Sequence, residues 1–233
     1  MIRILRFSLW TAVLFAGSDL MFSSLNQRLV MHPRAYAQAS AGLGINAQLL
    51  VAARNDDIAT VRRVLDNGAV PNSRNRTGDT ALMIFVRKGN AELVDLLIAK
   101  GADVNLQNLE KVTPLMTAAY HGDAAIARTL LDHGADMNAR DQLSKTAMVY
   151  AAGQGHTAIV ALLLDAGVDI DKAYRHDLTA LMWAAGYGKT ETVKLLLDRG
   201  ADRARKDDRG KTAGEIARDA KHDEVVELLK VGE

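Results

Sequence analysis

Histidine and carboxylate side chains are the groups of this sequence that could support metal binding or catalysis. The chain contains six His and no Cys, which excludes disulfides, thiolate zinc sites and Cys nucleophiles. No two His are three or four residues apart, the spacing that places two side chains on one helix face. His121, His176 and His222 stand at unrelated positions of the sequence repeat described below. We therefore expect neither a metal site nor a cofactor.

Carboxylates recur with a fixed spacing, as paired acid–base groups could. The recurring set is Asp103, Asp136, Asp169 and Asp202. Neighbours in a stack of helices lie about 8–10 Å apart, whereas a retaining carboxylate pair needs about 5–5.5 Å and an inverting pair also needs a deep cleft. We interpret these residues as turn residues. The sequence also lacks a phosphate-binding loop and a serine nucleophile motif, so we expect no enzyme.

The composition excludes several other classes of protein. Lys plus Arg is 29 and Asp plus Glu is 28, which gives a net charge of +1, whereas a nucleic-acid-binding protein needs excess positive charge to displace counterions. Hydrophobic residues make up 48% of the chain, so it is not a disordered protein. With 3 Pro and 5% aromatic residues, the sequence favours helices over a β-sandwich.

Residues 1–37 differ from the rest of the chain and are typical of an export signal. Arg3 and Arg6 precede the mostly apolar run 7–16. This run is too short to span a bilayer, because a spanning helix needs roughly 20 apolar residues. The segment 35–37 is Ala-Tyr-Ala, a small-x-small pattern that suits signal peptidase.

Cleavage after Ala37 or Ala39 would release a mature chain into the periplasm of a Gram-negative bacterium or into the medium. Loss of residues 1–37 removes four Arg and one Asp, so the net charge falls from +1 to −2. We then expect no stable membrane insertion. The alternative is an uncleaved signal that anchors the chain in the inner membrane.

A period of 33 residues organises the sequence after residue 46. It is visible in a Thr column, a Leu column and two Gly columns. The Thr column is Thr80, Thr113, Thr146, Thr179 and Thr212, and the Leu column is Leu97, Leu130, Leu163, Leu196 and Leu229. One Gly column runs from Gly68 to Gly200 and the other from Gly89 to Gly188. Four columns in phase indicate a repeat protein.

Each unit of the repeat is predicted to contain two helices and a loop. The Thr can cap the first helix by accepting a hydrogen bond from a backbone N–H, and Pro114 suits the first helical position. Ala118-Ala119 and its equivalents keep one helix face thin, and Gly122 or Gly155 suits the helix C-cap. The second helix is exemplified by 158–165, whose apolar residues have helical spacing.

The units resemble the ankyrin repeat. The resemblance is carried by TPLMTAAYHGD at 113–123, TALMWAAGYGK at 179–189 and LLDHGADMNARD at 130–141, and the family has a 33-residue period. It implies an all-α ankyrin-repeat solenoid of about six helix-turn-helix units with hairpin-like loop tips. We expect one domain, 38–233, whose polar end units act as caps. The expected units are 46–75, 76–108, 109–141, 142–174, 175–207 and 208–233.

The sequence departs from the family pattern at two places. The His of the Thr-Pro-Leu-His signature is absent, and we expect apolar packing to replace its hydrogen bonds. Its column reads Met83, Met116, Val149, Met182 and Glu215. We expect the Met residues to lie in the core. In the second unit the thin Ala pair becomes Phe85-Val86, whose bulk should push the first helices apart or fill a gap beside the first unit.

The resemblance also implies where a partner would bind. Members of the family bind proteins on a concave face lined by the loop tips and the first helices. By period, the tips are 74–79, 107–112, 140–145, 174–178 and 206–211. The first-helix positions that we expect to be exposed are Ile84, Tyr120, His121, Tyr150, Trp183 and Tyr187.

Tyr and Trp anchor many protein interfaces, so we predict a partner-binding patch centred on Tyr150 and Trp183. The alternative is that these rings only cover the thin Ala layer. The predicted patch consists of Tyr120, His121, Tyr150, Trp183, Tyr187, Tyr174 and Arg175.

We predict a monomeric, non-catalytic scaffold that binds an exported protein, and not a nucleic acid, through its concave face. One alternative is a stabilising or inhibitory subunit of a specific periplasmic enzyme. Another is a small-ligand-binding protein, which would need an enclosed cavity with convergent polar groups.

Overall fold

The computed structural model describes residues 42–230, and the predicted export signal at 1–37 lies outside the described residues. The described part consists of six successive helix pairs and one short 3₁₀ helix. None of its helices is long and apolar enough to cross a membrane.

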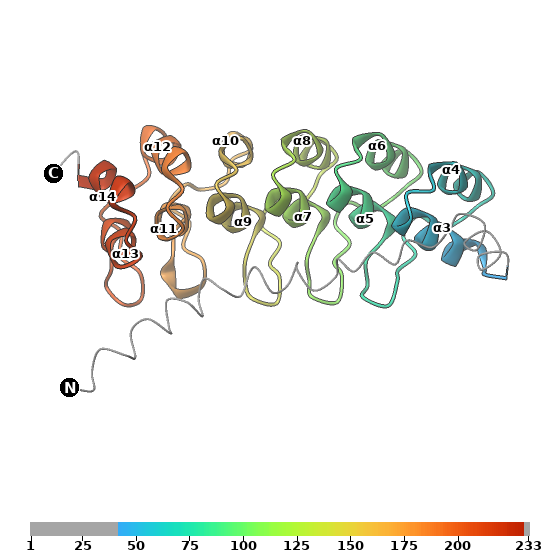
Figure 1. Cartoon of the computed structure of the whole chain (residues 1–233), viewed down its shortest axis with the longest axis horizontal. Helices are drawn as coiled ribbons and strands as arrows, with labels where there is room; N and C mark the ends of the chain where they lie inside the picture. The colour runs from blue at the N-terminus through green and yellow to red at the C-terminus, as the bar shows by residue number, and fades with distance from the viewer. Residues whose placement is uncertain (1–41, 231–233) are drawn as a thin grey trace, which may run out of the picture. The chain divides into compact units, whose positions relative to one another are not determined.

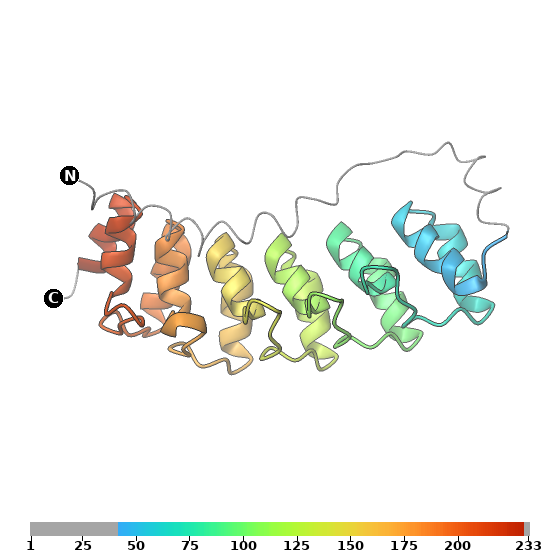
Figure 2. The same cartoon turned by 90° about the horizontal axis from the view of Figure 1, so that it is seen from below.

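The helix pairs stand side by side in single file, with the first helices in one row and the second helices in another (Figure 1). The first helices are α3 (Ile45–Arg54), α5 (Ala81–Lys88), α7 (Pro114–His121), α9 (Ala147–Gln154), α11 (Ala180–Gly186) and α13 (Ala213–Asp219). The second helices are α4 (Ile58–Asp66), α6 (Ala91–Ala99), α8 (Ala124–Asp132), α10 (Thr157–Asp165), α12 (Thr190–Asp198) and α14 (Asp223–Lys230). The loops between pairs project to one side of the stack (Figures 1 and 2). This arrangement confirms the predicted ankyrin-type solenoid.

The repeated spacing of Thr and Gly sets the ends of the first helices. The Thr113 hydroxyl accepts a hydrogen bond from the Met116 N–H at 3.2 Å, and each other Thr of the column caps its own helix in the same way. Helix α7 begins at Pro114 and is capped at its C-terminus by Gly122, whose φ is 84°. These caps confirm the helix boundaries that the sequence predicted, because each provides a partner for a backbone group that the helix leaves unpaired.

The core lies between the two helix rows and between neighbouring units. The Leu column is buried throughout, and Met83, Met116 and Met182 are at most 1% exposed. Apolar packing therefore takes the place of the family's His, as predicted. Two members of that column also complete an N-cap: the Thr179 N–H lies 3.4 Å from the Met182 sulfur, and the Thr212 N–H donates to Glu215 Oε2 at 2.8 Å.

Phe85 and Val86 are both fully buried in α5. The backbone of α5 makes fewer close contacts with α3 and α7 than α9 makes with α7 and α11, and α7, α9 and α11 have Ala pairs at the equivalent positions. This difference agrees with the prediction that the larger side chains push the first helices apart.

The loop tips are short hairpins, as predicted. In the second tip, 107–112, the Asn108 N–H donates to the Val112 carbonyl and the Lys111 N–H donates to the Asn108 carbonyl, both at 3.0 Å. The φ of Lys111 is 61°, so this tip is a tight turn followed by a left-handed residue, a common three-residue hairpin loop. Gly78, Ser144 and Gly210 are the left-handed residues of the first, third and fifth tips. Adjacent tips are joined by backbone hydrogen bonds, such as that from the Leu109 N–H to the Thr77 carbonyl at 3.0 Å.

Candidate partner-binding surface

Four aromatic side chains line the first helices of the third, fourth and fifth units. We call Tyr120, Tyr150, Trp183 and Tyr187 the aromatic row. Tyr120 meets the ring of Tyr150 edge to face, with centroids 5.9 Å apart, and Trp183 stacks on Tyr187 at 6.2 Å. Such pairs add about 0.5–1.5 kcal/mol beyond the burial of their area. The first pair joins the third and fourth units, and the second pair lies within the fifth unit.

Lys145 joins the two halves of the aromatic row. Its ammonium lies 5.5 Å from the centroid of the Tyr150 ring and 5.4 Å from that of Trp183, within the range of a cation–π interaction. Lys145 is only 7% exposed. An internal cation thus occupies the space between the rings of two successive units.

Asp141 binds the hydroxyl group of Tyr150. The Tyr150 hydroxyl donates to Asp141 Oδ2 at 2.5 Å, and Asp141 Oδ1 accepts the backbone N–H groups of Leu143 and Lys145 at 2.8 Å. Burial raises the pKa of the Tyr150 hydroxyl well above its usual range, and the charge of Asp141 raises it further. The centre of the row is therefore part of a hydrogen-bonded network that begins in the third loop tip.

The fourth tip, 174–178, is built differently from the other four. In the other tips an Asn or Asp side chain accepts backbone N–H groups of the turn, as Asn108 does from Glu110 and Val112 at 3.0 Å. Tyr174 stands at this position instead and is 6% exposed. The pKa of Tyr174 is raised to about 12, mainly by burial, although a hydrogen bond with Thr146 lowers this pKa.

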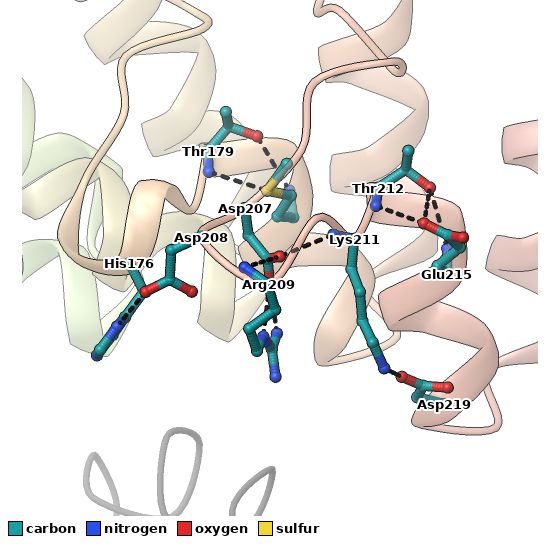
Figure 3. Close-up of polar contacts among 10 residues, drawn as sticks. His176, Thr179, Asp207, Asp208, Arg209, Lys211, Thr212, Glu215 and Asp219 are labelled. Atoms are coloured by element: carbon teal, nitrogen blue, oxygen red, sulfur yellow. Dashed lines mark hydrogen bonds and ion pairs between the residues drawn. The ribbon is translucent and has the colours of Figure 1, made fainter.

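The 3₁₀ helix η1 (Arg175–Asp177) forms this tip. His176 and Asp177 both have left-handed backbones, with φ of 62° and 55°. His176 Nδ1 lies 2.7 Å from Asp208 Oδ2 of the fifth tip, next to the Asp207 turn (Figure 3). The Asp208 N–H also donates to the His176 carbonyl at 3.1 Å, so the irregular tip remains joined to the next one.

The exposure that we predicted for part of the patch is wrong. Tyr150 and Trp183 are 3% and 4% exposed, and Ile84 is 7% exposed. Tyr150 and Trp183 are buried because each packs against another ring and against Lys145. The prediction that the centre of the patch is open surface therefore fails at these residues, and also at Tyr174.

The remaining predicted residues are accessible to different degrees. His121 and Arg175 are exposed, and Tyr120 and Tyr187 are half-buried. Tyr187 lies close to Gly153 of α9: a Cβ there would lie 3.5 Å from the Tyr187 ring, an ordinary van der Waals contact. Binding of a partner by these residues remains a prediction.

Two histidines connect neighbouring units. His156 Nε2 lies 3.0 Å from the Tyr120 carbonyl, and His222 Nε2 lies 3.2 Å from the Gly186 carbonyl. Partial burial lowers the pKa of His121, and electrostatic interactions with Arg87 and His156 lower it further. Among residues 42–230, no group of three or more His or acidic side chains could hold a metal ion.

The recurring Asp residues are turn residues, as predicted. The side chain of Asp103 accepts the Asn105 N–H at 2.8 Å, and Asp136 accepts the Asn138 N–H at 2.8 Å. Asn105 in turn reaches the next unit, where it donates to the Gly134 carbonyl at 3.0 Å and accepts the Asp136 N–H at 2.7 Å. These carboxylates thus accept hydrogen bonds from backbone N–H groups of their own turns.

The sequence did not identify Lys145 and Asp141 as residues that contact the aromatic row. The available signal was a polar residue in a column where the neighbouring units have apolar ones: Lys145 stands between Val112 and Leu178 in the 33-residue register. A charged residue at such a position needs a partner if it is buried. The sequence did not show that two rings would provide part of that environment.

Comparison with known families agrees with this fold. A family model described as ankyrin repeats, in three copies, matches residues 49–141, 93–174 and 148–232. Together these overlapping matches cover more than half of the chain. A search of curated proteins found no match.

Proposed function

Because the chain belongs to the ankyrin-repeat family, it is a protein–protein interaction scaffold, and we propose that it binds its partner on the face formed by the first helices and the loop tips of the third to fifth units. The observation that carries this proposal is the aromatic row, together with exposed His121, whose ring meets that of Tyr120, and exposed Arg175 of the fourth tip. Aromatic residues and Arg are enriched in interface hot spots. Held by Lys145 and Asp141, the row would lose little conformational entropy on binding.

Two histidines of the third unit provide a matched test. His121 is exposed at the end of α7, in the first-helix row, and His133 is exposed at the end of α8, in the second-helix row. We expect His121→Ala to weaken partner binding and His133→Ala to leave it unchanged. The measurement is the amount of each cross-linked partner recovered by quantitative mass spectrometry.

A second variant, Tyr120→Ala/Tyr187→Ala, removes the two half-buried ends of the row. It is preferable to a change at Tyr150 or Trp183, whose burial would make loss of binding and loss of folding hard to separate. Circular dichroism would establish that the variant is folded. Equal recovery of every partner by the wild type and by both first-helix variants would refute this location of the site.

We propose further that the chain is exported and acts on an exported protein, as its N-terminal sequence pattern suggests. The support is the positive start, the apolar run 7–16 and the Ala-Tyr-Ala segment. N-terminal sequencing of the protein purified from the native host should give Gln38 or Ser40 as the first residue. An intact Met1 in the membrane fraction would instead support the uncleaved anchor.

A further inference from the structure

The loop tips distribute their charges unevenly between the inside and the surface. Asp79, Asp141 and Asp207 are 3%, 4% and 5% exposed, and hydrogen bonds within the protein use each carboxylate. Asp207, for example, accepts the N–H groups of Arg209 and Lys211 at 2.9 Å (Figure 3). Asp141 and Asp207 hold their turns, whereas Asp79 accepts from the side chains of Arg87 and Asn108. All three present little negative charge to a partner.

Most basic residues of the tips are exposed, whereas Lys145 is buried. Exposed Arg209 is paired with Asp207, and no ion pair joins the other six exposed bases to a carboxylate within residues 42–230. They are Arg74, Arg76, Lys111, Arg140, Arg175 and Lys206. Within the tips, all of which are described, the exposed acids are Asp177 and Asp208, and Asp208 lies against His176. We call this line of five tips the basic edge.

The second-helix row has a different arrangement of charge. Several of its exposed acids are paired with bases of the same or the next unit, as in Lys100–Asp66 at 2.9 Å and Arg199–Asp165 at 2.7 Å. Other exposed acids of this row, such as Asp95, Asp132 and Asp198, are not in an ion pair within residues 42–230 and give the row negative charge. Such pairs neutralise each other locally, whereas unpaired bases of one sign sum to a field that attracts an anion. A net charge near zero therefore conceals a positive edge.

The geometry of the edge suits an extended chain. Neighbouring units are separated by about 8–10 Å, which is about three residues of a strand at roughly 3.3 Å per residue. The edge also has an apolar point, because Leu109 in the second tip is 65% exposed. Hydrogen bonds join it to the flanking tips: its N–H donates to the Thr77 carbonyl at 3.0 Å and its carbonyl accepts from Gln142 Nε2 at 2.7 Å.

We propose that the basic edge binds an extended acidic segment of the protein partner, with carboxylates at about every third residue and an apolar side chain against Leu109. This inference rests on the scaffold function proposed above and adds the chemistry of the partner. The first helices would contact the folded part of the same partner, and the edge would contact its acidic segment.

The probe is a fluorescein-labelled peptide of about 15 residues in Ser and Gly, with Glu at every third position and one central Leu. Its control has Gln in place of Glu. Fluorescence anisotropy with the full chain should show binding of the Glu peptide, an affinity that falls as salt screens the charges, and at least about tenfold weaker binding of the Gln peptide. Equal affinity for the two peptides would overturn the proposal.

Matched charge reversals test the location. Arg140→Glu/Arg175→Glu changes two exposed bases of adjacent tips, and Arg63→Glu/Arg128→Glu makes the same change in net charge on α4 and α8. We expect about tenfold weaker peptide binding for the first variant and less than about twofold for the second. An equal loss in both would show that only net charge matters, and would refute a specific edge.

Two further probes distinguish the class of partner. If an oligothymidylate or phosphatidylglycerol vesicles bind as tightly as the Glu peptide, the edge recognises polyanions in general and the assignment to an acidic protein segment is wrong. The scaffold function is tested separately. A chain that ignores the Glu peptide, yet loses its captured partner with His121→Ala, retains the proposed function without this edge.

Discussion

Residues at equivalent positions of the repeat have different structural roles in this protein. Asp141 and Tyr174 are 33 residues apart, and both stand at the first position of a hairpin turn. Asp141 accepts backbone N–H groups and also the Tyr150 hydroxyl, whereas Tyr174 fills the same place with a ring and leaves an irregular turn. Because Asp141 is 4% exposed, these hydrogen-bond donors, rather than water, stabilise its negative charge. The aromatic row is therefore expected to be sensitive to loss of the Tyr150 hydroxyl.

Tyr150→Phe tests this dependence through pH. The raised pKa of Tyr150 keeps the phenol neutral in the folded chain at pH values where the unfolded chain, with a pKa of about 10, has ionised. The stability that this group contributes is thus complete below about pH 10 and is lost as pH rises above it. From about pH 10 to 11 the wild type should lose about 1 kcal/mol more of its unfolding free energy than Tyr150→Phe.

Urea denaturation at a series of pH values measures this difference. At neutral pH the same variant should be less stable by about 1.5–3 kcal/mol, because the hydrogen bond to a charged group is lost. Parallel alkaline curves for the two proteins would show that Tyr150 ionises as readily in the folded chain as in the unfolded chain.

At the scale of helices and turns, glycines determine how closely neighbouring units can approach. Gly122 ends α7 with φ of 84°, and a Cβ on it would lie 2.5 Å from the ring of His156 in the next unit. Gly134 has φ of 80°, but a Cβ there would meet nothing within 4 Å. The two positions share the backbone strain of a left-handed residue and differ in the contact between units.

A comparison of Gly122→Ala with Gly134→Ala therefore separates the cost of the left-handed backbone from the cost of the contact with His156. Each should lose about 1–2 kcal/mol for the left-handed backbone, and Gly122→Ala should lose roughly 1 kcal/mol more because it displaces His156 from the Tyr120 carbonyl. Thermal or urea unfolding gives both values. Equal destabilisation by the two substitutions would mean that His156 moves aside without cost.

The loop tips allow a stabilising change. The fourth turn residue is Gly in the first and last tips, where Gly78 and Gly210 have φ of 81° and 77°, but it is Lys111 in the second tip, with φ of 61°. Lys111→Gly should relieve this conformation and raise stability by about 0.5–1 kcal/mol, after the larger entropy of unfolded Gly is subtracted. Lys111→Ala removes the same charge without relieving the backbone, so a gain in both variants would assign the effect to charge.

At the scale of the whole molecule, the order and ends of the helices were predictable from the sequence, while the arrangement of the site was only partly so. The Thr and Gly columns act through local backbone hydrogen bonds, so their spacing alone sets the first helices. The burial of Trp183 depends on Lys145 and Tyr150, which belong to the neighbouring unit, and residue spacing does not encode the direction of a side chain. The same limit applies to the inward orientation of Asp79 and Asp207.

A stack in single file also predicts how far a local defect can spread, because each unit packs only against its neighbours. Phe85 is fully buried in α5, between the first and third units, and Leu163 is fully buried in α10, near the middle of the stack. Ala occupies the Phe85 position in the next three units, yet Phe85→Ala should cost about 3–5 kcal/mol, since the wider spacing around α5 would leave a cavity. Leu163→Ala should cost about 2–5 kcal/mol.

Native-state hydrogen exchange would show where each cost is felt. Phe85→Ala should accelerate amide exchange mainly in α3 to α6, because the end of the stack can open while α9 to α12 remain packed. Leu163→Ala should reduce protection from exchange on both sides of α10. When the unit that contains α10 unfolds locally, the units before and after it each lose a packing partner. If both variants lowered protection uniformly from α3 to α14, the described units would unfold only as a single block, and coupling between non-adjacent units would have to exceed the nearest-neighbour contacts seen here.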